Sequence, residues 1–462
     1  MELIGSIPVF GGLFTMVIAF VVALSVIVTV HEYGHYIVGR WCGIHAEVFS
    51  LGFGKVLYSR TDKRGTVWQL AAIPFGGYVK FLGDADASSR NDDSALAAMD
   101  AETRNRSFHG AALYKRALTV VAGPVANFLL SIAVFFALVL WSGLATDTPT
   151  VGKLKLLPDA VNELKTGDVI LSINGVEIKD YSGLYEYARY STVVPEQIYS
   201  VKRGDEILFV RGPFPLLPLI ETVSPQSAAM AAGLLEGDVI LSIDGQALTA
   251  FSELQSVVGA SAGKELDLSI WRDGEISQVK LAAKPSDVPD GEGGFKSRVL
   301  IGISGGLFFE PLTYTPSVIE ALQIGATRTL GIMTGSLNAL AHMVKGKISA
   351  CNLQGPIGMA GIAGDTAAQG LPDFINFIAV LSTAIGLLNL FPIPVLDGGH
   401  LMFFGYEAIA RRKPNEKVMN VLMTGGLIFV LALMMFGLST DLLCRFLPMI
   451  PAARISDSFI WF

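Results

Sequence analysis

The sequence has few charged residues and few cysteines, and both shortages exclude classes of protein. Only 16% of its 462 residues are charged, whereas soluble domains typically contain roughly 25%. The net charge of -7 gives no reason to expect a nucleic-acid partner. Cys42, Cys351 and Cys444 are far apart and none belongs to a CxxC pair, so we expect no disulfide framework and no cysteine zinc site. A thiol nucleophile stays open, although no motif supports one.

Hydrophobic residues are abundant, at 51% of the chain, and the mean hydropathy is +0.51. Four stretches contain no charged residue and approach or exceed the ~20 apolar residues that cross a bilayer as a helix. They are Val9–Val30, Ala117–Thr146, Phe374–Leu396 and Val418–Thr440. The first lacks the basic n-region and the cleavage site of a signal peptide, so we expect it to be retained. The sequence therefore predicts a polytopic α-helical membrane protein with four transmembrane helices.

Basic residues are distributed unevenly among the loops, and this predicts the orientation. No Lys or Arg precedes Arg40, whereas the loop 40–116 contains many and three more occupy positions 411–413. The positive-inside rule places these two loops in the cytoplasm. We therefore expect both termini and the long region 147–370 on the outer side, which is the periplasm if the membrane is a bacterial inner membrane.

The long outer region contains an internal repeat. Leu164–Leu184 reads LKTGDVILSINGVEIKDYSGL, and Leu234–Leu254, 70 residues later, reads LLEGDVILSIDGQALTAFSEL. Each copy contains an apolar β-prone run followed by Asn-Gly or Asp-Gly, which is a strong signal for a tight turn. A period of 70 is too long for a solenoid and suits two copies of a small domain.

The repeated pattern G-D-x-I-x-x-I-[ND]-G resembles PDZ domains. Its turn residues are Gly167 and Asp168 in the first copy and Gly237 and Asp238 in the second. PDZ domains bind an extended peptide or a chain terminus by adding it as a strand to a sheet edge. The sequence therefore predicts two periplasmic PDZ-like α/β domains, and a pair of spacers that bind nothing is the alternative.

The first span ends in His31-Glu32-Tyr33-Gly34-His35. On a helix, positions i and i+4 share one face, so His31 and His35 can reach the same metal ion. Two neutral imidazoles suit Zn²⁺, which lowers the pKa of a bound water to about 7. Glu32 is close enough to take the proton of that water. Because polar groups at membrane depth are expensive, three of them at this spacing indicate one catalytic zinc ion per chain.

Catalytic zinc usually has three protein ligands, and the third span offers a candidate. Residues 389–399 read NLFPIPVLDGG. Two prolines before Asp397 and two glycines directly after it interrupt the helix. Broken backbone at this depth is tolerated only where it is buried in protein or lines a wet cavity. We expect Asp397 to be the third ligand. His400 is a rival, and an interfacial loop role for Asp397 is the other alternative.

The cytoplasmic loop contains two β-prone, glycine-punctuated stretches, Glu47–Lys55 and Thr66–Leu82. A substrate helix must open before its peptide bonds can be cut, and its freed backbone groups then need new partners. We hypothesise a membrane-associated β-hairpin that approaches the active site and pairs with the substrate as an added strand. An ordinary soluble hairpin is the alternative. Its glycines, proposed for substrate handling, are Gly52, Gly54, Gly76 and Gly77.

HExxH in the first span combined with N-x-x-P-x-P-x-L-D-G in a later span resembles the site-2 protease family. Gly123–Phe128 (GPVANF) and Asn352–Ile357 (NLQGPI) are also similar to that family. The tandem PDZ-like pair between the second and third spans is typical of its bacterial regulator-of-sigma-E protease type. The chain departs most from that type in the first PDZ-like unit and in the polar insert Asp84–Arg106.

The resemblance implies an intramembrane zinc metalloendopeptidase acting in regulated intramembrane proteolysis. It implies that His31, His35 and Asp397 bind zinc, that Glu32 is the catalytic acid and base, and that Asn389, Pro392 and Pro394 shape substrate handling. Members of this type cut single-span anti-sigma factors, in envelope-stress signalling, after another protease has trimmed their periplasmic part. Some also remove remnant signal peptides. The implied partners are such a substrate and membrane lipid, whereas the oligomeric state is not predicted.

These features predict a linear order of parts along the chain. The parts are a first transmembrane helix with HExxH (1–43), a cytoplasmic loop with the hairpin (44–110), a second transmembrane helix (111–146), two PDZ-like domains (147–215 and 216–290), a linker with interfacial amphipathic helices (291–370), a third transmembrane helix (371–404), and a cytoplasmic loop, fourth transmembrane helix and tail (405–462).

Two other functions stay open: a membrane scaffold with a structural metal site, and a metal transporter. A transporter usually shows repeated spans with matched ligands, and no such repeat is present among these spans.

Overall fold

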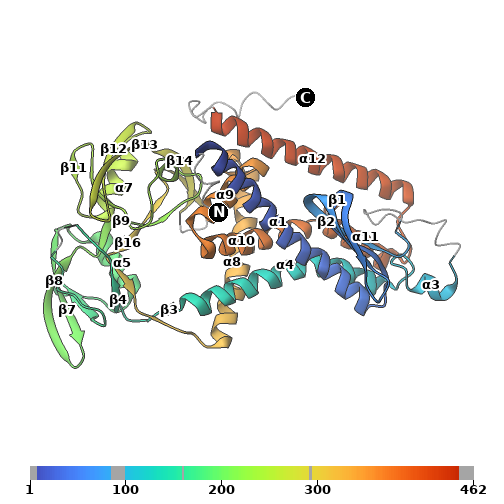
Figure 1. Cartoon of the computed structure of the whole chain (residues 1–462), viewed down its shortest axis with the longest axis horizontal. Helices are drawn as coiled ribbons and strands as arrows, with labels where there is room; N and C mark the ends of the chain where they lie inside the picture. The colour runs from blue at the N-terminus through green and yellow to red at the C-terminus, as the bar shows by residue number, and fades with distance from the viewer. Residues whose placement is uncertain (1–7, 85–98, 159–160, 291–293, 447–462) are drawn as a thin grey trace. The chain divides into compact units, whose positions relative to one another are not determined.

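The computed structural model describes residues 8–84, 99–158, 161–290 and 294–446. These residues form two compact units, which are described separately (Figure 1). The helical unit contains residues up to Leu138, Val318–Val344 and the chain from Ser349, and the β-rich unit contains Val139–Ser317 with Lys345–Ile348. Most of the predicted insert Asp84–Arg106 lies outside the described residues.

Four long helices dominate the helical unit, as the apolar stretches predict. They are α1 (Pro8–Trp41), α4 (Leu113–Ser142), α10 (Leu371–Asn389) and α12 (Glu416–Phe446). Each contains a segment long and apolar enough to cross a membrane, and these segments are Gly12–Trp41, Leu113–Ser142, Leu371–Asn389 and Lys417–Leu443. The four predicted spans are therefore confirmed by length and composition.

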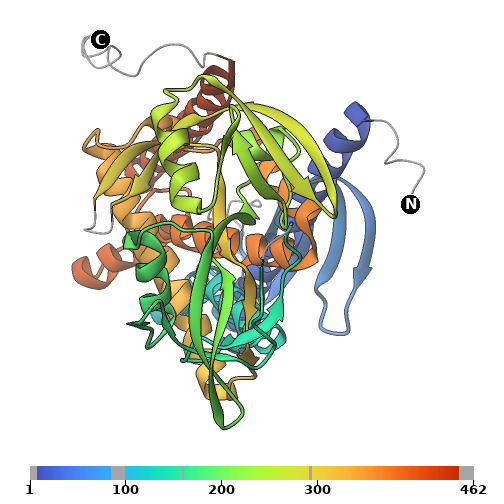
Figure 2. The ribbon, with the colours of Figure 1, turned by 90° about the vertical axis from the view of Figure 1, so that its left-hand side faces the viewer.

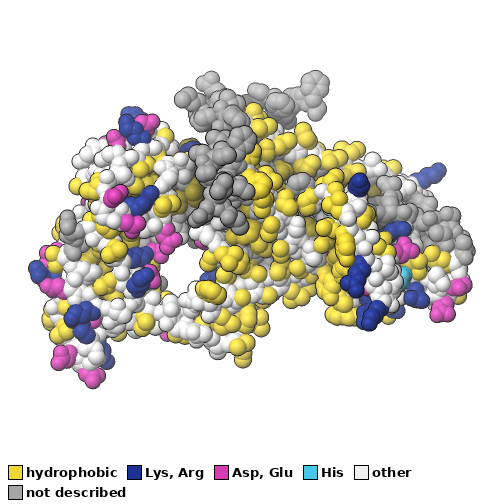
Figure 3. All heavy atoms as spheres, viewed as in Figure 1, with side chains coloured by type: hydrophobic (Ala, Val, Ile, Leu, Met, Phe, Trp, Pro, Cys, Tyr) yellow, Lys and Arg dark blue, Asp and Glu magenta, His cyan; other side chains and the backbone are white. Residues whose placement is uncertain are grey.

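The surface of the helical unit agrees with this composition. Large hydrophobic side chains are exposed along α12 and along the outer face of α1, including Ile428, Met435 and Phe14. Figure 3 shows hydrophobic side chains over most of the visible face of this unit. An apolar surface of this extent needs a partner other than water, and lipid is the partner that four apolar helices imply.

Shorter elements complete the helical unit. They are the strands β1 (Ala46–Thr61) and β2 (Val67–Phe81), the helices α3 (Ala101–Asn105), α8 (Val318–Val344), α9 (Pro356–Gln369) and α11 (Asp397–Ala410), and the 3₁₀ turn η1 (Ala350–Asn352). Strands β1 and β2 pair as an antiparallel hairpin, with Leu51 opposite Gly77. The hairpin is a long two-stranded ribbon, which Figure 2 shows clearly. Leu57 and Tyr58 of β1 are exposed, whereas the turn itself contains Asp62, Lys63 and Arg64, so the turn end is charged.

Helices α1, α4 and α10 approach one another through small and polar residues. A Cβ atom at Gly34 of α1 would lie only 2.4 Å from the carbonyl oxygen of Ala122 in α4. Between α4 and α10, the Ser131 hydroxyl donates to the Ala379 carbonyl at 2.8 Å, and the Ser382 hydroxyl donates to the Asn127 carbonyl at 3.0 Å. Small residues and interhelical hydrogen bonds replace the hydrophobic driving force that is missing in lipid. These contacts bring the three helices close at the level of His31.

The β-rich unit contains two repeat modules. The first consists of β4 (Val151–Leu154), β5 (Val169–Ile173), β6 (Val176–Glu177), α5 (Tyr181–Tyr190), β7 (Glu196–Arg203) and β8 (Glu206–Pro213). The second consists of β9 (Leu216–Val223), α6 (Ala228–Ala231), β10 (Val239–Ile243), β11 (Gln246–Ala247), α7 (Phe251–Ala260), β12 (Glu265–Arg272), β13 (Glu275–Ala282) and β16 (Ile303–Leu307). The identical Val-Ile-Leu-Ser-Ile stretches form β5 and β10, which are sheet strands in the same setting in both modules.

The two modules are interleaved rather than consecutive. Strand β16 pairs with β9 at the edge of the second module, and after Phe308 the chain continues as β17 (Phe309–Pro311), which pairs with β4 of the first module. Phe308 and Phe309 are fully buried in the hydrophobic core of the first module. The first module is therefore completed by residues that follow the second module in the sequence.

The ends of the β-rich unit meet. Strand β3 (Leu144–Ala145) pairs with β18 (Thr313–Tyr314), and the Thr146 amide donates to the Leu312 carbonyl at 3.0 Å. The remaining strands, β14 (Lys284–Pro289) and β15 (Phe295–Leu300), form a separate hairpin. Both modules are thus inserted into the helical unit through one two-stranded stem.

One cysteine departs from the expectation drawn from the sequence. Cys351, in η1, is disulfide-bonded, whereas Cys42 at the end of α1 is free. Wide spacing along the chain argued against a disulfide, but spacing in sequence does not limit which thiols the fold brings together. The expectation that the cysteines form no disulfide was therefore wrong for Cys351.

Candidate metal centre

Three side chains converge where α1, α4 and the start of α11 meet. His31 and His35 lie one turn apart on α1, and their Nε2 atoms are 3.2 Å from each other. Asp397, the first residue of α11, places Oδ2 at 3.2 Å from His31 Nε2 and Oδ1 at 3.5 Å from His35 Nε2. Ligand atoms that share one tetrahedral zinc ion at 2.0–2.1 Å lie about 3.3 Å apart. The three side chains therefore have the mutual spacing of a zinc ligand set.

The Nδ1 atoms of both histidines are held by α4. His35 Nδ1 lies 2.9 Å from the Thr119 carbonyl, and this contact requires a proton on Nδ1. His31 Nδ1 lies 3.2 Å from the side-chain amide of Asn127. A ligating histidine typically donates its other N–H to such a partner, which fixes the tautomer and aims Nε2 at the metal. The helix α4 therefore orients both imidazoles for metal binding through Nε2.

Two observations test whether a metal fits this set. Within the described part of the chain, Asn127 Oδ1 is buried and has no hydrogen-bond partner. Turning the amide so that Oδ1 accepts from His31 Nδ1–H removes that deficit and leaves His31 Nε2 as a lone-pair donor. At Gly123 of α4, an added Cβ would lie 2.3 Å from His35 Nε2 and 2.9 Å from His31 Cε1. The space beside the ligating atoms is thus kept free of side chains, and the residues present fit a zinc ion.

Glu32 lies beside this set, between α1 and the hairpin. The backbone N–H of Val79 in β2 hydrogen-bonds to the Glu32 carboxylate. A Cβ atom at Gly77 would lie 3.2 Å from Glu32 Cγ and 2.8 Å from the Ser50 carbonyl oxygen. Strand β2 therefore packs directly against the carboxylate that the sequence predicts as the proton carrier. Of the other predicted hairpin glycines, Gly52 and Gly54 lie in β1 and Gly76 lies beside Gly77 in β2.

The interrupted third span places Asp397. Helix α10 ends at Asn389, and the chain turns through Pro392 and Pro394 before α11 begins at Asp397. At Gly398, an added Cβ would lie 2.3 Å from the carbonyl oxygens of Leu390 and Phe391, so this glycine lets the turn fold back onto α11. Asn389 and the two prolines therefore shape the segment that presents Asp397, the predicted third ligand.

His400, the rival ligand, lies one helical turn beyond Asp397 in α11. Among the described residues, the only cluster of metal-binding side chains within ligand distance is His31, His35 and Asp397. The structure therefore brings together the set preferred from the sequence and leaves His400 outside it.

The Gly-Asp pair that occurs in both repeats has a structural role, which explains why both modules contain it. Asp168 is fully buried and accepts two hydrogen bonds of 2.7 Å from Arg203, and Asp238 is bonded in the same way by Arg272 at 2.6 and 2.7 Å. Burial raises the pKa of the Asp168 carboxyl, but hydrogen bonds from Arg203 and the Lys165 amide outweigh it and hold the pKa below its usual range. The Asp–Arg ion pairs therefore stabilise the start of β5 in the first module and of β10 in the second, and they do not form a reactive site.

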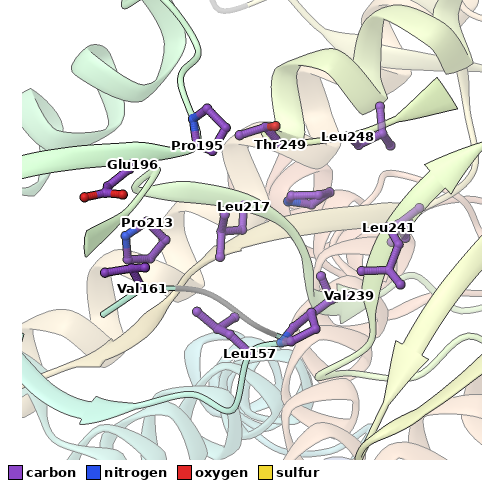
Figure 4. Close-up of a pocket in the computed structure, with 13 residues that line it drawn as sticks. Leu157, Val161, Pro195, Glu196, Pro213, Leu217, Val239, Leu241, Leu248 and Thr249 are labelled. Atoms are coloured by element: carbon purple, nitrogen blue, oxygen red, sulfur yellow. The ribbon is translucent and has the colours of Figure 1, made fainter. Parts of the chain in front are cut away.

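A pocket of about 310 Å³ lies within the β-rich unit, between its two modules (Figure 4). Its lining is mainly apolar, with Leu157, Leu217 and Leu241 among the residues, and Glu196 is its one titratable side chain. Glu196 forms an ion pair with Arg211. Among the described lining residues this single, ion-paired carboxylate has no second titratable group or metal-binding side chain beside it, so catalysis is assigned to the metal centre and not to this cavity.

The structure shows contacts at the metal centre for residues to which the sequence analysis assigned no role. Asn127, the Thr119 carbonyl and Gly123 surround the histidines from α4, and Val79 contacts Glu32 from β2. Gly123 and Asn127 are separated by four positions within GPVANF, so one helix face presents both to α1. That spacing was the available signal, but it has meaning only once α4 is known to pack against α1.

The chain is similar to known proteins over most of its length. Residues 19–433 match the family described as "Peptidase family M50". A protein of Agrobacterium fabrum named "Putative zinc metalloprotease" is 35% identical over 437 residues, covering 94% of this chain and 97% of the relative. The regulator of sigma-E protease RseP of Escherichia coli is 34% identical, covering 92% and 97%. The regulator of sigma E protease of Salmonella typhi is 32% identical with the same coverage.

Proposed function

Because the chain belongs to peptidase family M50 and is a zinc metallopeptidase of the site-2 protease type, we propose that it hydrolyses peptide bonds within the transmembrane segments of single-span proteins. One observation supports this most directly: His31 and His35 on the apolar helix α1 lie beside Asp397, which follows the break between helices α10 and α11. A ligand set surrounded by apolar helices suits a substrate that arrives through the membrane rather than from water.

His31, His35 and Asp397 would hold the zinc ion, which supplies a Lewis acid and lowers the pKa of bound water. Glu32 takes a proton from the attacking water as the water oxygen bonds to the scissile carbonyl carbon. The carbon–nitrogen bond then breaks, and Glu32 delivers the proton to the leaving nitrogen, which departs as an amine. Thr119 and Asn127 hold the imidazoles in place throughout, while the Val79 amide orients the Glu32 carboxylate.

The hairpin β1–β2 presents the substrate in this proposal. An unwound substrate segment needs partners for its backbone N–H and C=O groups, each of which costs several kcal/mol if left unpaired in lipid. The sheet contains two strands. Residues 48–51 of β1 pair both with residues 77–80 and with residues 67–70 of β2, so among the described residues the outer edge left for a third strand beside Glu32 is that of residues 77–81. Since β2 contacts Glu32 through Gly77 and Val79, a strand added to the hairpin would be held beside the catalytic carboxylate.

The proposed activity is tested with purified full-length protein and a synthetic single-span peptide in detergent. We expect cleavage to fall by about a hundredfold or more in a zinc chelator and to return when one equivalent of Zn²⁺ is restored, because zinc makes water acidic enough to react at neutral pH. Chelator saturated with zinc beforehand is the control. Cleavage that continues at full rate in metal-free protein would refute the zinc mechanism.

The physiological substrate we propose is a trimmed, membrane-spanning anti-sigma factor, with remnant signal peptides as a second class. The regulator-of-sigma-E proteases among the relatives support this choice by name. We further propose that the two modules are PDZ-like domains on the periplasmic side of the inner membrane, with the metal centre toward the cytoplasmic side. The uneven Lys and Arg distribution supports this orientation. So does the disulfide at Cys351, because disulfides persist in oxidising compartments such as the periplasm.

The PDZ-like pair acts in this proposal as a filter that excludes substrates with bulky outer domains. A deletion that removes the second module together with the residues that follow it would also take Phe308 and Phe309 out of the core of the first module. Deleting 147–311 instead joins Thr146 to Leu312, whose backbones already hydrogen-bond. We expect this deletion to raise cleavage of an untrimmed substrate with a folded outer domain by about tenfold, which corresponds to ~1.4 kcal/mol of lost discrimination.

The matched measurement uses the same substrate with its outer domain removed. Its cleavage should differ by less than about twofold between the full chain and the deletion, since the filter has nothing to exclude. Equal preference for trimmed over untrimmed substrate in both proteins would show that the modules are not the filter.

A further inference from the structure

The helix α9 begins without a capping side chain of its own. Its N-cap residue is Gly355, which forms no side-chain cap hydrogen bond, and Pro356 follows at the first helical position. The first turn of any helix leaves backbone N–H groups without partners inside the helix. Pro356 has no N–H, so the donors that need partners here are those of Gly355, Ile357 and Gly358.

Asp441, near the end of α12, receives all three of these donors. Its Oδ1 accepts from the Gly355 amide at 2.9 Å, and its Oδ2 accepts from the amides of Ile357 and Gly358, each at 3.0 Å. A carboxylate at a helix N-terminus also interacts favourably with the helix dipole. A residue 83 to 86 positions away in the sequence thus acts as the cap of α9.

The helix backbones are shaped for this contact. An added Cβ at Gly355 would lie 2.3 Å from the Gly437 carbonyl oxygen of α12 and 2.5 Å from Asp441 Oδ2. The neighbouring Thr440 hydroxyl donates to the Leu353 carbonyl at 3.3 Å. Close backbone approach at two facing glycines together with charge-assisted hydrogen bonds makes a specific junction between the two helices.

Each of the two joined helices also packs against an element of the metal centre. On α9, Ala363 is fully buried in one cluster with Ile27 of α1, which lies one turn before His31. On α12, a Cβ added at Gly426 would lie 3.2 Å from Pro394, in the turn that leads into Asp397. The junction at Asp441 therefore connects the support of a histidine ligand to the support of the carboxylate ligand.

We propose that Asp441 is a positioning residue for the peptidase reaction, which fixes α12 onto the N-terminus of α9 and so keeps Asp397 in register with His31 and His35. This inference rests on the proposed function for its kinetic consequence, although not for the capping itself. It assigns a role to an acidic residue within the apolar segment of α12, where an unpaired carboxylate would be costly.

The test compares Asp441→Leu, Asp441→Asn and the control Ser439→Ala in the zinc-loaded, full-length protein. Ser439 is partly buried on α12, and its hydroxyl donates within that helix, to the Phe436 carbonyl. We expect Asp441→Leu to speed hydrogen exchange at all three capped amides at least tenfold. It should lower kcat for the single-span peptide by roughly tenfold to a hundredfold with KM within about twofold, and weaken zinc retention against a chelator by a similar factor.

Asp441→Asn keeps one oxygen and replaces the other by an NH₂ group. We expect faster exchange at the Gly355 amide only, with kcat within about threefold of the unaltered protein, and no change in Ser439→Ala. Unchanged exchange at all three amides in both Asp441 variants would overturn the proposal, and so would faster exchange in Asp441→Leu with unaltered kcat and zinc retention. If Asp441→Leu does not fold, the exchange pattern of Asp441→Asn decides. If the unaltered protein cleaves no single-span peptide, the proposed function fails, while exchange and zinc retention still decide the role of Asp441.

Discussion

Replacing Glu32 with glutamine is expected to lower cleavage of a single-span peptide by roughly a hundredfold to ten-thousandfold, the usual contribution of a general acid–base residue. Glutamine has nearly the shape of glutamate but cannot take a proton from water or deliver one to the leaving nitrogen. Its side-chain oxygen can still accept from the Val79 amide. The fold and the zinc content should therefore be unchanged, and turnover and metal analysis on the same sample measure both.

The zinc analysis is what makes this variant informative. Retained zinc with lost cleavage assigns proton transfer to Glu32, and it also separates a peptidase from a scaffold with a structural metal site, in which Glu32 would be dispensable. Turnover close to that of the unaltered protein would remove Glu32 from the mechanism, whatever the metal content.

Adding a single methyl group at Gly77 is expected to lower kcat by about tenfold or more, because a 1 Å misplacement at a catalytic site can cost a hundredfold. The new Cβ would lie 2.8 Å from the Ser50 carbonyl oxygen and 3.2 Å from Glu32 Cγ. Strand β2 must then move away from β1 or from Glu32. Zinc binding should persist, because Gly77 touches none of the three ligands, and steady-state kinetics with metal analysis will show whether it does.

Gly405→Ala is the matched control, since a Cβ at that position in α11 meets nothing within 4 Å. A second pair of variants addresses strand addition at the hairpin: Ala72→Pro removes a backbone N–H from β2, whereas Ala72→Ser keeps it. If Gly77→Ala and Ala72→Pro both cleave as well as their controls, the hairpin has no part in presenting substrate.

Sequence patterns anticipated the elements that depend on local chemistry. Uninterrupted apolar runs predicted α1, α4, α10 and α12, and the spacing of His31 and His35 predicted one helix face. The two prolines after Asn389 predicted the break in the third span, because proline cannot continue a helix at that point. Asp397 was predicted as a ligand because catalytic zinc usually has three protein ligands.

What the sequence did not predict depends on contacts between distant segments. Asn127 and Gly123 acquire their roles only because α4 packs against α1 at the histidines. Asp441 acquires its capping role only because α9 packs beside α12. The pairing of β17 with β4 has no local signal either, since a strand's partner is set by tertiary packing rather than by its own residues.

The interleaving of the two modules has a consequence for how the chain matures. Chains are made from the N-terminus, and domains generally fold as units during synthesis. The first module, however, needs Phe308, Phe309 and strand β17 for its core. These residues are synthesised only after the whole second module. Until then β4 has no β17 partner and the core around Tyr199 stays open. The first module to be translated is therefore the last to close, and its apolar core residues stay exposed until the chain has been made through β17.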